Sequence, residues 1–172
     1  MARIEHPLDK IAGRNHDGGY RSGAAFSASK DGLDRFRDPF TLMELELQTV
    51  SYGSVSVLRC RGKLVYGPET AEFERGVRQA LETTKEIVLH MADVSRIDSG
   101  GVGALGTAFV AAHNREAQIK LAALPPRVED VLRITGLGLL FDIRNSESEA
   151  VAAFLAGEKY EPAGLEGMIK AG

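Results

Sequence analysis

From residue 42 onward the chain has a regular pattern of apolar and polar residues, at first with the two-residue period of a β-strand. Between residues 42 and 48 every second position is apolar, which is typical of a strand with one face in water. A Tyr52-Gly53 turn signal and an apolar run over residues 55–60 predict a second strand, hairpinned to the first. Residues 87–91 are almost continuously apolar, which predicts a central strand covered on both faces.

Helical periodicity appears between the strands. Apolar residues recur every three or four positions over residues 68–82, 101–115 and 128–135, and Gly136 suits a C-terminal cap. Two further strands are predicted at residues 119–124 and 139–143, and a last helix at residues 147–156. Loops are predicted at residues 62–68 and in the polar segment after residue 91. The order β-β-α-β-α-β-α-β-α predicts an α/β fold with a largely parallel sheet.

The 172-residue length fits one domain with tails. Residues 1–41 have no regular period and are interpreted as a flexible N-terminal extension, with residues 42–156 as the domain and residues 157–172 as a flexible C-terminal tail. The net charge is 21 − 24 = −3, which argues against nucleic acid as a partner. The single cysteine cannot form an internal disulfide, and no signal sequence or membrane span is apparent. We therefore expect a cytoplasmic protein without direct membrane insertion.

The most informative segment joins the predicted central strand to the second helix through Asp98-Ser99-Gly100-Gly101. The first N–H groups of a helix lack intrahelical partners and attract anions. We expect Ser99 at or beside the N-cap, so that a phosphate on its oxygen would lie near the N–H groups of Gly100, Gly101 and Val102. Local physics leaves two interpretations of this segment open. It could be a phosphorylation site, or Asp98 and Ser99 could simply be ordinary helix caps.

The run Asp93-Val-Ser95-Arg-Ile97-Asp98-Ser99-Gly-Gly101-Val102-Gly103 resembles the phosphorylation loop of the STAS domain family, the anti-sigma factor antagonists. The resemblance extends over residues 42–156. It implies a four- to five-stranded, mostly parallel mixed sheet with about four helices packed mainly on one face. Gly100 departs from the Ser or Ala often found there, which should loosen the helix start.

The resemblance also implies residue roles. Ser99 would be phosphorylated by an anti-sigma factor serine kinase, and only the unphosphorylated protein would bind that kinase and so release sigma factor. Support of the loop is assigned to Asp93, Ser95, Asp98, Gly100 and Gly101. Partner contacts are assigned to the loop and the second helix, namely Asp98, Ser99, Gly101, Val102, Thr107 and Ala111.

The resulting expectation is a non-enzymatic binding switch with no cofactor and no metal, for which a homodimer stays open. Two alternatives stay open: an accessory subunit of a lipid ABC transporter, and a component of a stressosome-type scaffold. Gly101-Val-Gly103-Ala-Leu-Gly106 also satisfies the dinucleotide-binding pattern G-x-G-x-x-G. It is rejected because the glycines follow the apolar run by ten residues instead of forming a tight turn after a strand. The histidines are dispersed, and no G-x-S-x-G elbow supports a hydrolase.

Overall fold

The computed structural model of the protein describes residues 44–162. They form a five-stranded sheet with the strands in sequence order, β1 to β5. The strands are β1 (Glu46–Tyr52), β2 (Val55–Leu64), β3 (Glu86–Ile97), β4 (Gln118–Ala122) and β5 (Asp142–Arg144). β1 pairs antiparallel with β2, and every later pair is parallel. The predicted hairpin, the central strand and the mixed, mostly parallel sheet are confirmed. The predicted extension of residues 1–41 lies outside the described residues.

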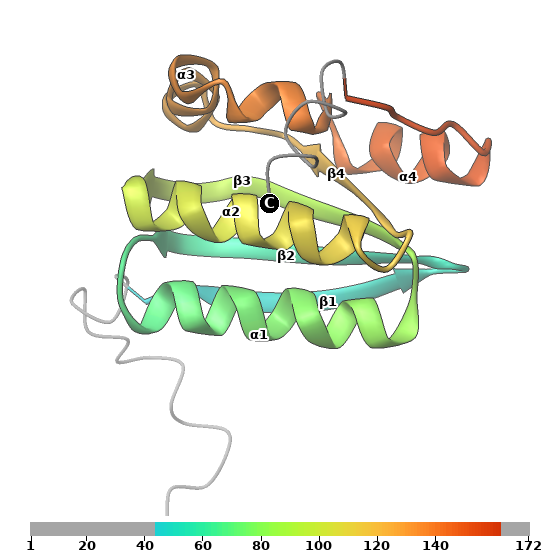
Figure 1. The fold of residues 1–172 in the computed structure, drawn as a ribbon, viewed down its shortest axis with the longest axis horizontal. Coiled ribbons are helices and arrows are strands. Elements are labelled where there is room, and N and C mark those ends of the chain that lie inside the picture. The colour runs from blue at the N-terminus through green and yellow to red at the C-terminus, as the bar shows by residue number, and fades with distance from the viewer. Residues whose placement is uncertain (1–43, 163–172) are drawn as a thin grey trace, which may run out of the picture. The chain divides into compact units, whose positions relative to one another are not determined.

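Within residues 44–162, α-helices cover both faces of this sheet, three on one face and one on the other. The helices are α1 (Pro68–Thr83), α2 (Ser99–His113), α3 (Pro126–Thr135) and α4 (Glu147–Leu155). α1 and α2 lie side by side along one face (Figure 1). Successive side chains of each strand face opposite sides of the sheet, so each strand contributes to two cores. Leu58 and Leu89 belong to the larger core with α1, α2 and α3, whereas Val57 and Val88 pack against α4.

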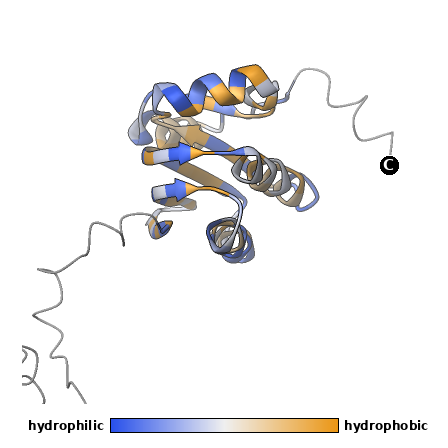
Figure 2. Ribbon diagram, turned by 90° about the vertical axis from the view of Figure 1, so that its left-hand side faces the viewer, coloured by the Kyte–Doolittle hydropathy of each residue, from blue (hydrophilic) through white to orange (hydrophobic). Residues whose placement is uncertain are grey.

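The amphipathic pattern of the helices explains this packing. The buried residues of α1 are Phe73, Val77, Ala80 and Leu81, which share one helical face. Figure 2 shows the pattern as alternating hydrophilic and hydrophobic bands along the helix ribbons. The C-cap of α3 is Gly136, whose φ of 72° is the left-handed conformation of the cap expected from the sequence.

β2 and β3 are longer than the sequence predicted. Residues 62–64 and 92–97 were expected in loops, but both are strand residues, and Leu64 pairs with Ile97. Two register irregularities between β2 and β3 break the alternation on which strand prediction depends. β4 pairs with β3 only up to His90. Beyond that point the sheet consists of β1, β2 and β3, and this projecting part ends at the start of α2.

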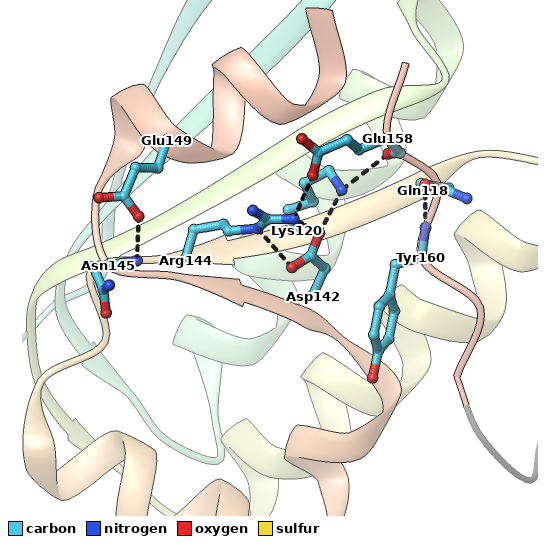
Figure 3. A network of polar contacts seen from close by, with 8 residues as sticks. All are labelled: Gln118, Lys120, Asp142, Arg144, Asn145, Glu149, Glu158 and Tyr160. Atoms are coloured by element: carbon cyan, nitrogen blue, oxygen red, sulfur yellow. Dashed lines mark hydrogen bonds and ion pairs between the residues drawn. The ribbon is translucent and has the colours of Figure 1, made fainter. Parts of the chain in front are cut away.

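Two boundaries near the C-terminus also differ from the prediction. The strand expected at residues 139–143 is a 3-10 helix, η3 (Leu137–Leu140), followed by the short β5. Residues 157–162, assigned from the sequence to the tail, are held against β4 and β5 in part by a charge network around the buried Lys120 (Figure 3). Lys120, only 1% exposed, pairs with Asp142 at 2.5 Å and donates to the carbonyl of Glu158. Arg144 joins the side chains of Asp142 and Glu158.

Candidate functional site

The predicted loop is a one-residue junction between β3 and α2, at the tip of the projecting strands. Asp98 is the N-cap of α2, and Ser99 is the first helical residue. One carboxylate oxygen of Asp98 accepts the Gly101 N–H at 3.0 Å, and its carbonyl accepts the Val102 N–H at 2.9 Å. The N–H groups of Gly101 and Val102 therefore have partners. The expectation that they are free to receive a phosphate was wrong, because the Asp98 side chain and carbonyl already bind them.

The same carboxylate holds a second segment of the chain. The Tyr66 N–H donates to both carboxylate oxygens of Asp98, at 3.0 and 3.1 Å. Hydrogen bonds from the backbone of Gly101, Tyr66 and Gly100 lower the pKa of Asp98, and Arg96 adds to the effect. Asp98 is therefore ionised at neutral pH and joins the loop after β2 to the start of α2.

The Ser99 side chain is exposed. Among residues 44–162 its hydroxyl has no hydrogen-bond partner. Of the two residues that the sequence offered as ordinary helix caps, Asp98 is the N-cap of α2 and Ser99 is not. A phosphate on this oxygen would add about −1.5 to −2 charges beside the ionised Asp98. The first helical residue thus presents an accessible hydroxyl beside an ionised carboxylate.

Two glycines allow the end of β2 to lie against the start of α2. A Cβ on Gly101 would approach the Leu64 carbonyl oxygen to 2.1 Å, and a Cβ on Gly100 would lie 2.6 Å from the Cβ of Tyr66 and 2.7 Å from its Cα. Gly100 therefore accommodates a neighbouring backbone, whereas the sequence suggested only a looser helix start. Tyr66 was missed at the sequence level. Two consecutive glycines at a helix start are the signal that could have indicated such a close approach.

Asp93 and Ser95 lie within β3 and not in a loop. The Ser95 hydroxyl donates to the Gly62 carbonyl at 3.1 Å, which ties β3 to β2. Asp93 is exposed and lies opposite Arg61 in the strand register. Among the described residues, neither side chain has a hydrogen bond to Asp98 or Ser99. Any support they give to the junction acts through the β2–β3 pair.

The predicted contact residues of α2 differ in exposure. Thr107 is exposed, and its hydroxyl donates to the Gly103 carbonyl at 3.0 Å. Val102 is half-buried, and Ala111 is half-buried against the larger core. Thr107 therefore offers the most accessible side chain of the three.

The glycines of the G-x-G-x-x-G pattern all lie inside α2. β3 continues to Ile97, so the predicted gap of ten residues between strand and glycines was wrong. Gly101 serves the close packing described above, and Gly103 faces open space. In the part of the chain that the structure describes, no group of three or more His, Cys, Asp or Glu side chains is placed to hold a metal ion. No helix within residues 44–162 is both long and apolar enough to cross a membrane.

A groove of about 610 Å³ lies on the α4 face, between β1, β2 and α4. Its polar part is the ion pair of Arg59 with Glu147 at 2.7 Å, to which the Tyr52 hydroxyl is also bonded. Since these groups bond to one another, they fix the start of α4 to the sheet.

Comparisons with known proteins agree with this architecture. The sequence model of the STAS domain family matches residues 46–150. The Bacillus anti-sigma factor antagonist SpoIIAA, in its unphosphorylated form, is 20% identical with a TM-score of 0.56, covering 67% of this chain and 100% of that chain. An anti-sigma factor antagonist from Mycobacterium paratuberculosis is 18% identical with a TM-score of 0.56, over 64% of this chain and 93% of that one. The murine Solute Carrier 26 family member A9 anion transporter is 16% identical with a TM-score of 0.57, over 68% of this chain and 23% of the transporter. At these identities the likeness concerns the fold.

Proposed function

Because the chain belongs to the STAS domain family, we propose that it is a cytoplasmic anti-sigma factor antagonist whose partner binding is controlled by phosphorylation of Ser99. STAS domain proteins are generally non-enzymatic binding modules, and the proposed role requires no catalysis by this chain. The partner is an anti-sigma factor serine kinase. Binding of the unphosphorylated protein would occupy that kinase and release sigma factor.

The observation that carries this proposal is that the two adjacent residues at the start of α2 have different roles. Asp98 caps α2 and holds Tyr66, while the exposed Ser99 hydroxyl has no hydrogen-bond partner within the described residues. A kinase therefore reaches the acceptor oxygen without disrupting a cap. In the transfer, the Ser99 oxygen bonds to the γ-phosphorus of ATP, ADP leaves, and the hydroxyl proton passes to a base of the kinase.

The phosphate would act mainly on the partner. The N–H groups of Gly101 and Val102 are already bonded to Asp98, so they do not draw the new anion into the helix start. The phosphate would add its charge to that of Asp98 on an exposed surface. A partner that covers this surface would then have to desolvate two adjacent anions, which opposes binding.

The test is a phosphoryl-transfer assay with each anti-sigma serine kinase encoded by the source genome, purified in turn. With ATP, one of these kinases should phosphorylate the wild-type protein and the Ser51→Ala control but not Ser99→Ala. Ser51 is a matched control because it is an exposed serine on β1, outside the junction. Phosphate on another residue, or on none with any of the kinases, contradicts the proposal. Capture of a transporter ATPase equally by wild type, Ser99→Ala and Ser99→Asp would instead favour the accessory-subunit alternative.

A further inference from the structure

Tyr66 combines a fixed backbone with an exposed ring. It is 84% exposed, the largest fraction among the exposed large hydrophobic side chains of the described residues. Its N–H is bonded to both oxygens of Asp98, and its Cα and Cβ lie where a side chain at Gly100 would otherwise be. The backbone that carries the aromatic ring is thus held at a defined place, and the ring is not used to fill the core.

That place is beside the proposed acceptor. Asp98 and Gly100, the two residues that Tyr66 approaches, are the chain neighbours of Ser99. Because the Tyr66 backbone contacts both chain neighbours of Ser99, we expect a protein that buries the ring to cover the Ser99 hydroxyl as well. Exposed tyrosines with a rigid backbone lose little conformational entropy on binding, and tyrosine is enriched among the residues that dominate interface energies.

We propose that Tyr66 is the anchor by which the partner recognises the unphosphorylated junction. The inference rests on the proposed function and deepens it, since it names the side chain that carries the affinity of the same site. The complementary surface is an apolar pocket on the kinase with a polar group to receive the phenolic hydroxyl. Gly100 permits this arrangement, because any larger residue would push the Tyr66 backbone away from Asp98.

The anchor also explains how one phosphate could have a large effect. A partner pocket that encloses Tyr66 excludes water from the neighbouring surface. The phosphate on Ser99 would then lie at the rim of a desolvated contact, where an unpaired charge is costly. Phosphorylation and anchoring would therefore act on the same part of the interface.

The experiment is a calorimetric titration of the anti-sigma serine kinase that phosphorylates Ser99 with four proteins: wild type, Tyr66→Ala, Ile134→Ala and Ser99→Asp. Ile134, on α3, is a matched control because it is an apolar side chain 80% exposed. Tyr66→Ala should weaken binding by about tenfold or more, and Ile134→Ala by less than about twofold. The bonds from residue 66 to Asp98 are made by its backbone, so the thermal midpoint of Tyr66→Ala should equal that of wild type.

The outcomes separate the two proposals. If Ser99→Asp weakens binding but Tyr66→Ala binds like wild type, the phosphorylation switch stands and the anchor is overturned. If Tyr66→Ala and Ile134→Ala weaken binding equally, the ring has no special role and the anchor is also overturned. If no kinase binds the wild-type protein, both proposals fail.

A fluorescence reporter gives a second readout. The chain contains no tryptophan, so Tyr66→Trp places a single indole beside Ser99. Saturating kinase should shift its emission to shorter wavelength as the ring enters the pocket. Unchanged emission in a complex that forms with wild-type affinity would contradict the anchor.

Discussion

The backbone N–H of Tyr66 donates to both carboxylate oxygens of Asp98, at 3.0 and 3.1 Å. The same carboxylate accepts the N–H of Gly101. One side chain therefore fastens the loop after β2 to the first turn of α2. The junction is therefore ordered in the unmodified protein, and this order depends on the charge and the position of the Asp98 carboxylate.

Replacement of Asp98 should destabilise the domain in a graded way. Asp98→Ala removes the cap of α2 and the acceptor of Tyr66, whereas Asp98→Asn keeps one oxygen and the ability to cap. Urea denaturation should rank the free energy of unfolding as wild type, then Asp98→Asn, then Asp98→Ala. Asp93→Asn is the control, since this exposed acid has no hydrogen bond to the junction in the described residues, and it should resemble wild type. Equal stability of all four proteins would contradict the role given to Asp98.

The contribution of the Asp98 charge should also depend on pH in a defined direction. Because its pKa is lowered in the folded protein, the unfolded state binds a proton more readily, with a pKa of about 3.9. The stability difference between wild type and Asp98→Asn should therefore be constant above about pH 5 and shrink as the pH falls through the folded pKa. A difference that grows on acidification would contradict the lowered pKa.

The three glycines near the start of α2 should respond differently to alanine. Gly103 faces open space, so Gly103→Ala should stabilise the protein by about 1 kcal/mol through helix propensity. Gly101→Ala should destabilise it, because the new Cβ would lie 2.1 Å from the Leu64 carbonyl oxygen. Gly100→Ala should destabilise it as well, through Tyr66. Chemical denaturation measures all three, and a stabilising Gly100→Ala would contradict the close approach.

Phosphorylation should leave the fold unchanged. The helix start is already capped by Asp98, and the Ser99 side chain faces solvent. Amide chemical-shift changes between the unmodified and the phosphorylated protein should be confined to residues near the junction and Tyr66. Changes that extend to α3 and α4 would indicate a rearrangement and contradict a switch that acts at the surface.

The buried pair of Lys120 and Asp142 should matter more than surface ion pairs. Asp142→Ala leaves a lysine that is 1% exposed without its counter-ion, and should lower the free energy of unfolding by about 3 to 5 kcal/mol. Lys120→Met should cost less, because Asp142 keeps its bonds to Arg144. The control Asp130→Ala breaks an exposed i,i+3 pair with Arg133 and should cost no more than about 0.5 kcal/mol. Equal losses for Asp142→Ala and Asp130→Ala would contradict the account.

The sequence predicted the fold well where the apolar pattern is clear. The central strand at Ile87–Met91 follows from a continuous apolar run. The helix that begins at Pro68 and the cap at Gly136 follow from helical periodicity and from the special backbone of proline and glycine. The second half of β3 was missed because its inward-facing residues, Met91, Val94 and Ile97, are three positions apart. Irregular pairing with β2 causes that spacing, and it does not resemble a strand in the sequence.

The site was predicted in part for a similar reason. Asp98 and Ser99 are adjacent in the sequence, so their place at a helix start could be predicted from local signals. Which of the two caps the helix depends on the backbone angles at the junction. Tyr66 lies 32 residues before Asp98, and no periodic pattern connects them. Only the parallel pairing of β2 with β3 brings the two residues together.

The most direct test of the phosphorylation switch is the ratio of two dissociation constants. The unmodified protein and the same protein carrying phosphoserine at position 99 are titrated into the serine kinase that phosphorylates Ser99, at the same ionic strength. The account predicts that the phosphorylated protein binds at least about tenfold more weakly, because its phosphate lies beside the ionised Asp98 at the contact. Equal dissociation constants for the two forms would contradict it.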